Sequence, residues 1–93
     1  MEELLKKLNI NKTGEFKGDV YTIELSSYDE FSMVYNKLEQ DDSIKKDSDE
    51  SYFNMDEAHV MYLADDYDIN LNGDLNADLY VLTIEEVKEQ EVD

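Results

Sequence analysis

The sequence lacks several residue types, and each absence removes a class of structure or site. It contains no cysteine, so a disulfide framework and a thiolate zinc site are excluded, and we expect a reducing compartment, the cytoplasm of a host bacterial cell. Proline and tryptophan are also absent, and glycine occurs only three times. No apolar run reaches the roughly 18 residues that a membrane span needs. We therefore expect neither a secreted nor a membrane protein.

Residue types that carry catalysis are scarce as well. There is one histidine, His59, and no glycine-rich phosphate loop, so the sequence offers no nucleophile-and-base pair and no nucleotide motif. His59 lies in the apolar segment 58–64, where we expect it to be a packed core residue. We expect a protein that is not an enzyme, has no catalytic residue and uses no cofactor.

Negative charge is what the sequence has in excess. Twenty-five acidic residues, eight lysines and no arginine give a net charge of −17. Residues 1–46 hold ten acids and seven lysines, whereas residues 47–93 hold fifteen acids and only Lys88. Self-repulsion of this size destabilises the compact state, and solubility alone would be served by mixed, evenly spread charge. The C-terminal half therefore predicts a surface that binds a basic partner.

Hydrophobic periodicity predicts the elements of the N-terminal half. Leucines at helical spacing indicate a short helix over residues 2–8. Apolar and polar residues alternate over 15–25, which is typical of a strand. Ser27 followed by Glu30 is a capping-box pattern, and the apolar residues after it recur at helical spacing. These features predict a helix over Tyr28–Gln40.

The pattern of the C-terminal half predicts strands. The segment 58–64 is apolar on both faces, as expected of a central strand. Alternating segments 67–72 and 79–84 are separated by a region that opens with the turn dipeptide Asn72-Gly73, so they predict a hairpin.

These elements together predict an α+β fold. We expect a three- to four-stranded antiparallel sheet, a capped helix packed on one face and a short N-terminal helix. A single domain should span residues 1–93, with 41–51 a flexible acidic loop and 85–93 an acidic tail.

One twelve-residue segment, Asp68–Leu79, is similar to the calcium loop of EF-hands and dockerins. Side chains with oxygen stand at its first, third, fifth and ninth positions, and glycine stands at the sixth. The twelfth position, which should supply a carboxylate, is leucine, and no second copy of the loop occurs. We expect no bound metal, and a calcium-binding, dockerin-like interaction module remains an alternative.

The acids around the segment 67–72 are the predicted partner-binding site. Side chains on one face of a strand recur about every 6.6 Å, close to two base-pair steps of roughly 3.4 Å in DNA. Aspartates on such a face could therefore stand where phosphates would, and a tyrosine could fill an apolar pocket of the partner. The predicted residues are Asp56, Glu57, Asp65, Asp66, Tyr67, Asp68, Asp74 and Asp78.

In size, cysteine-free composition, net charge and mixed α/β layout, the chain resembles the small acidic DNA-mimicking inhibitors of phages and mobile elements. These include anti-CRISPR proteins, antirestriction proteins and uracil-DNA glycosylase inhibitors. The resemblance implies a non-enzymatic protein that blocks the DNA-binding site of a bacterial defence nuclease, with a CRISPR-Cas effector as first choice. It assigns no role to any residue.

The expected partner is therefore a basic nucleic-acid-binding protein, and the chain itself should bind neither nucleic acid nor membrane. We expect a monomer or a small homo-oligomer. An alternative of another class is an immunity or antitoxin protein that neutralises a basic toxin or nuclease, in which case the acids steer association.

Overall fold

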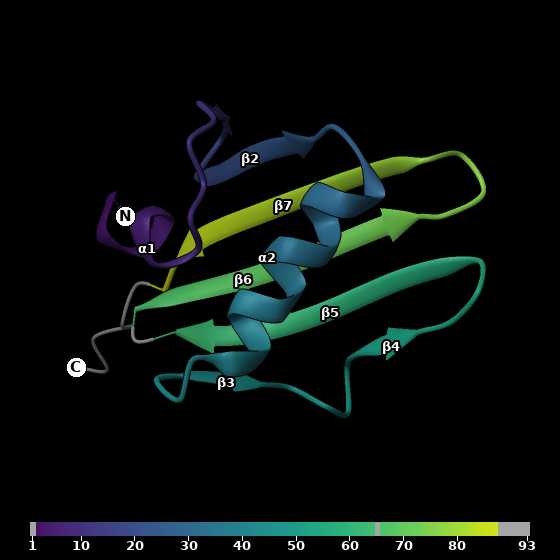
Figure 1. The fold of residues 1–93 in the computed structure, drawn as a ribbon. Coiled ribbons are helices and arrows are strands. Elements are labelled where there is room, and N and C mark those ends of the chain that lie inside the picture. The colour runs from purple at the N-terminus through teal and green to yellow at the C-terminus, as the bar shows by residue number, and fades with distance from the viewer. Residues whose placement is uncertain (1, 65, 88–93) are drawn as a thin grey trace.

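The computed structural model describes residues 2–64 and 66–87, which form two helices and seven strands (Figure 1). The predicted α+β class is confirmed. In chain order the elements are α1 (Glu2–Lys7), β1 (Glu15–Lys17), β2 (Val20–Leu25), α2 (Tyr28–Gln40), β3 (Ile44–Lys46), β4 (Tyr52–Phe53), β5 (Glu57–Ala64), β6 (Tyr67–Asp74) and β7 (Leu79–Glu86). In the described part of the chain, no helix is long and apolar enough to cross a membrane.

All strands belong to one antiparallel sheet. Their order is β1-β2-β7-β6-β5-β3, and β4 also pairs with β5. The three long strands β5, β6 and β7 follow one another as a meander, and β2 from the N-terminal half lies beside β7. The predicted count of three to four strands is wrong. It misses β1, β3 and β4, which are two or three residues long and too short for alternation to be visible.

The helix α2 has the bounds that the sequence predicts. Ser27 is its N-cap, and the Ser27 hydroxyl oxygen accepts a hydrogen bond of 3.3 Å from the Glu30 N–H. Its buried face consists of Phe31, Val34 and Leu38. The helix lies across one face of the sheet (Figure 1). The predicted N-terminal helix is also present as α1.

The core lies between these helices and the sheet, as one cluster of buried side chains. Phe31 is fully buried, with its ring centroid 5.1 Å from that of Tyr80 and 5.8 Å from that of Phe53. The other side chains of this cluster are Leu4, Leu8, Ile23, Leu25, Val34, Leu38, Ile44, Ala58, Val60, Tyr62, Ala64, Ile69, Leu71, Leu82 and Ile84.

The predicted turn at Asn72-Gly73 is wrong, because β6 continues through both residues to Asp74. The chain reverses after Asp74, whose carboxylate accepts hydrogen bonds of 3.2 Å from the Asn76 N–H and 3.1 Å from the Ala77 N–H. Glycine is needed at position 73 for side-chain packing and not for a reversal of the chain. A Cβ at this position would lie 2.9 Å from Cδ1 of Tyr80, so only glycine leaves room for that ring.

In three further segments the observed structure differs from the structure predicted from the sequence. The predicted strand 15–25 is a hairpin of β1 and β2, because Gly18 takes a φ of 65° and reverses the chain. Strand β3 lies inside 41–51, the segment predicted to be a flexible loop. Of the predicted tail 85–93, Glu85 and Glu86 belong to β7, and residues 88–93 lie outside the described part of the chain.

Candidate interaction surface

One face of the sheet packs against the helices, and among the described residues neither helix covers the opposite face (Figure 1). Successive residues of a strand point to opposite faces, so buried side chains in β5, β6 and β7 alternate with more exposed ones. We call the second set the uncovered face. With the residues of the other strands that pair with them, it consists of Glu15, Lys17, Val20, Thr22, Glu24, Lys45, Tyr52, Glu57, His59, Met61, Leu63, Asp68, Asn70, Asn72, Asp74, Leu79, Val81, Thr83 and Glu85.

The uncovered face carries two pairs of opposed carboxylates. Glu57 lies directly across from Asp74, and Asp68 lies directly across from Glu85. Residues in such positions have Cβ atoms about 4.5–5.5 Å apart, and like charges there are destabilising. The two pairs are six residues apart along β6, or about 20 Å at roughly 3.4 Å per residue. Negative charge is therefore concentrated near both ends of this face.

Lysines neutralise acids elsewhere on the molecule. The ion pairs of the described chain join Lys7 to Asp41, Lys12 to Glu30 and Lys46 to Glu39, with N···O distances of 3.7, 2.7 and 3.5 Å. All three acids belong to α2 or to its C-cap. No lysine occurs in the sequence between residues 47 and 87, the segment that supplies β5, β6 and β7. In the register of the sheet, Lys45 lies across from Leu63 and Lys17 lies across from Val20, so each of these lysines is one strand away from the Asp68–Glu85 pair. The pair at the other end, Glu57 and Asp74, has no lysine in its row.

The predicted partner-binding residues divide between the two ends of the sheet. At one end, which we call the hairpin end, the β4–β5 turn and the β6–β7 turn lie side by side and carry four of them: Asp56, Glu57, Asp74 and Asp78. Asp66 and Asp68 lie at the opposite end. Asp66 precedes β6, so only Asp68 of these two belongs to the uncovered face, and Asp65 lies outside the described residues.

Tyr67, the remaining predicted contact, lies on the helical side of the sheet. Its side chain is half-buried and packs against the core, on the face opposite Asp68. The structure therefore brings together only the four acids of the hairpin end, and it separates them from Asp66, Tyr67 and Asp68 by the length of β6.

The hairpin end is held together by hydrogen bonds. The side-chain oxygen of Asn54 accepts from the N–H groups of Asp56 and Glu57, at 2.8 and 2.9 Å, which fixes the β4–β5 turn. Asp56 links this turn to the next one, because its carbonyl oxygen accepts from the Leu75 N–H at 3.0 Å. The two turns therefore present their side chains from a connected frame.

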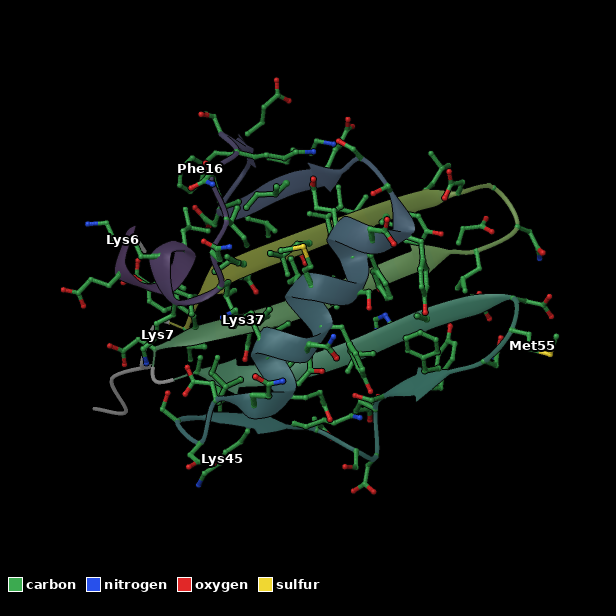
Figure 2. The ribbon with its side chains drawn as sticks, viewed as in Figure 1. Lys6, Lys7, Phe16, Lys37, Lys45 and Met55 are labelled. Atoms are coloured by element: carbon green, nitrogen blue, oxygen red, sulfur yellow. The ribbon has the colours of Figure 1, made fainter. Side chains whose placement is uncertain are left out.

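Apolar side chains are exposed among these acids. Met55 at the tip of the β4–β5 turn is 90% exposed, and Leu79 at the start of β7 is 64% exposed. Figure 2 shows Met55 projecting from this end of the molecule, away from the labelled Lys6, Lys7, Lys37 and Lys45. Exposed apolar groups surrounded by charged ones are typical of protein interfaces.

A shallow hollow of about 260 Å³ opens on the uncovered face near the hairpin end. It contains His59, which corrects the expectation of a packed core histidine: the side chain is half-buried, and Nδ1 contacts the Asn72 side-chain oxygen. The Tyr52 ring lies 5.7 Å from the His59 ring, centroid to centroid. Burial, together with the charge of Glu57 and a hydrogen bond to it, raises the pKa of Tyr52.

Within the segment that is similar to a calcium loop, only residues 75–78 form a turn. Asp68 to Asp74 are residues of β6, so the side chains of this segment alternate between the two faces of the sheet instead of converging on one ion. Among the described residues, no group of three or more histidine, aspartate or glutamate side chains is arranged to hold a metal ion.

Sequence reasoning missed several residues of this surface. The alternation in 57–64 does contain the signal: the buried positions are Ala58, Val60, Tyr62 and Ala64, so His59 necessarily points to the other face. Glu85 was assigned to a tail, although it pairs with Asp68 in the sheet. Tyr52 has no local signal, because β4 is only two residues long and is defined by its pairing with β5.

The comparisons with known proteins give no relative to reason from, since no family model, no curated protein and no solved structure matches the chain.

Proposed function

We propose that this protein is a non-enzymatic inhibitor that imitates nucleic acid and occupies the DNA-binding site of a bacterial defence nuclease, with a CRISPR-Cas effector as first choice. The observation that carries the proposal is the separation of charge. Three acids of α2 and its C-cap are paired with lysines, whereas the two opposed carboxylate pairs lie on β5, β6 and β7, a segment without lysine.

The spacing of these carboxylates suits a groove that binds DNA. Two acidic pairs about 20 Å apart span roughly six base-pair steps of about 3.4 Å each. A nuclease channel lined by lysine and arginine binds DNA mostly through the phosphate backbone and gains free energy by releasing counterions. A rigid acidic face would bind the same channel by the same electrostatics, without presenting any sequence to be read.

Two variants of equal net charge test the proposal. The face variant carries Glu57→Gln, Asp68→Asn, Asp74→Asn and Glu85→Gln, which neutralise the four opposed acids. The control variant carries Glu3→Gln, Asp42→Asn, Asp49→Asn and Glu50→Gln, which neutralise four exposed acids outside the uncovered face. Both lose four negative charges, so a difference between them reports where the charge lies and not how much there is.

The measurement is target-DNA binding by a guide-loaded CRISPR nuclease in the presence of increasing inhibitor, made at two salt concentrations. We expect the natural chain and the control variant to displace DNA. The face variant should be weaker by about a hundredfold or more, because losing one interfacial charge pair costs about 2–5 kcal/mol. An equal loss of inhibitory strength in both variants would contradict a localised mimic of DNA. Failure of the natural chain to compete with DNA for any defence nuclease would refute the proposed function.

A second candidate function is favoured by the exposed apolar side chains of the hairpin end. Met55 and Leu79 suit an apolar pocket on a protein surface better than a channel built for phosphates. An immunity or antitoxin protein that covers a basic toxin would use acids and apolar anchors together. DNA would then fail to displace the inhibitor from its partner, and Met55→Ala would weaken binding as much as the face variant does.

A further inference from the structure

The hollow on the uncovered face has a defined construction. Two rows of side chains form its walls, and each row runs across neighbouring strands in register. One wall is Glu57, Asp74 and Leu79, and the other is Tyr52, His59, Asn72 and Val81. Between the rows lie Ala58 and Gly73, whose positions face the core, so the floor is backbone that no large side chain fills.

The acidic wall holds two carboxylates with no lysine near them in the strands. Glu57 and Asp74 stand directly opposite each other, and both are exposed. Asp74 is already partly engaged, because it accepts backbone hydrogen bonds in the β6–β7 turn. Each carboxylate still has acceptor capacity, since one can accept about four hydrogen bonds.

The opposite wall is aromatic. The Tyr52 and His59 rings are 5.7 Å apart with 36° between their planes, and Tyr52 is 48% exposed. An exposed tyrosine ring attracts a cation over its face. The hollow thus sets an aromatic surface beside a pair of carboxylates, within about one side-chain length of each other.

We propose that this hollow receives a single arginine side chain of the partner protein. A guanidinium group is planar and carries five N–H donors, so it can donate to both Glu57 and Asp74 while it stacks on Tyr52. Its charge also relieves the repulsion between the two opposed carboxylates. A lysine ammonium would satisfy the charge but offers neither the planar stacking surface nor the forked donors.

The inference rests on the proposed function in so far as that function supplies a basic partner, but its test involves no nuclease and no DNA. The ¹⁵N-labelled full chain is titrated with the tripeptide acetyl-Ala-Arg-Ala-amide and, separately, with its lysine counterpart of equal charge. Chemical shifts of the backbone amides and of the His59 ring report where each peptide binds. Expected are saturable shifts centred on His59, Asn72 and Asp74, with the arginine peptide binding more tightly than the lysine peptide.

Matched variants show which side chains contribute to the affinity for the arginine peptide. Glu57→Gln with Asp74→Asn should weaken binding of the arginine peptide by about tenfold or more, since hydrogen bonds to charged groups are lost. Asp68→Asn with Glu85→Gln removes the same charge at the other end of the face and should change the affinity by less than about twofold. Tyr52→Leu should weaken arginine binding by about two- to fivefold, as expected for a lost cation–π contact.

Thermal melts accompany each variant, and an unchanged or raised melting temperature shows that lost binding is not lost folding. Equal weakening by the two acidic double variants, or shifts spread over all acids, would overturn the proposal in favour of a diffuse field. Equal affinity for the two peptides with no effect of Tyr52→Leu would also overturn it. If the arginine peptide binds as expected while nuclease binding to DNA is unaffected, the proposed function fails and the arginine site stands.

Discussion

Neutralising one member of each opposed carboxylate pair should stabilise the protein. The chosen changes are Glu57→Gln and Glu85→Gln, because Asp74 caps the β6–β7 turn and Glu85 is exposed at the end of β7. Each substitution removes a repulsion across the sheet and leaves the shape of the side chain nearly unchanged.

The magnitude follows from the register of the strands. Charged groups on directly opposite residues lie about 6 Å apart, where Coulomb repulsion is about 0.7 kcal/mol in water and about 3 kcal/mol at an effective dielectric constant of 20. The exposure of Glu57, Asp74 and Glu85 favours the lower figure, so each change should add about 0.5–1 kcal/mol to the free energy of unfolding. The pairs are about 20 Å apart and should act additively.

The assay is thermal and urea unfolding of the single and double variants at 0.05 and 1 M salt. The double variant should melt about 4–8 °C higher per kcal/mol gained, in the size range of this chain. Most of the gain should vanish at 1 M salt, where the Debye length is about 3 Å. A gain that is equally large at high salt, or no gain at low salt, would refute the repulsion argument. Adding Asp74→Asn to Glu57→Gln should bring no further gain, because the opposing charge is already gone.

Three further predictions concern the frame that supports the surface. Gly73→Ala should destabilise the fold by about 1–3 kcal/mol in urea unfolding, because its Cβ would lie 2.9 Å from Cδ1 of Tyr80; an unchanged midpoint would contradict that packing role. Asn54→Ala should cost about 1 kcal/mol and increase amide exchange at Asp56 and Glu57, since it removes the acceptor of both N–H groups. Hydrogen bonds from Ser43 lower the pKa of Asp41 from its ordinary 3.8, so this carboxylate stabilises the fold above that value and loses the contribution as the pH falls through its lower folded pKa. Asp41→Asn should therefore reduce stability at pH 7 and flatten the acid dependence measured by unfolding below about pH 4.

Local signals predicted the parts of this fold that depend on local interactions. The helix α2 was predicted to its terminal residues because its cap and its apolar period are both contained in the segment itself. Strands β3 and β4 could not be predicted, since they are short and exist only through pairing with β5, which follows them in the chain. The turn predicted at Asn72-Gly73 was wrong for a related reason. Glycine is required at position 73 because the Tyr80 ring of the neighbouring strand packs against it, and the sequence alone does not distinguish such a glycine from one in a turn.

The candidate site shows the same limit. The excess of charge in the C-terminal half was visible from the sequence, and four of the predicted acids do lie together at the hairpin end. The opposition of Glu57 and Asp74 depends on the register between β5 and β6, which no local pattern contains. The partial exposure of His59 depends on the absence of a helix over this face of the described sheet. The alternation places His59 on the face opposite Ala58 and Val60, but it does not show whether that face is covered.

The position of β2 in the sheet has a consequence for how the chain folds. Leu25 pairs with Tyr80 and Val20 pairs with Glu85, so more than half of the 93 residues separate the partners. The meander of β5, β6 and β7 closes through short turns and can form early, whereas docking β2 requires a long loop to close, which is slow. During synthesis the N-terminal half emerges first, and the edge of β2 that is not paired with β1 has no partner until β7 has been made. Ile23 and Leu25, which the finished sheet buries, lack their β7 neighbours throughout that interval, so we expect the free edge of β2 to be where a nascent chain would first engage a chaperone or another copy of itself.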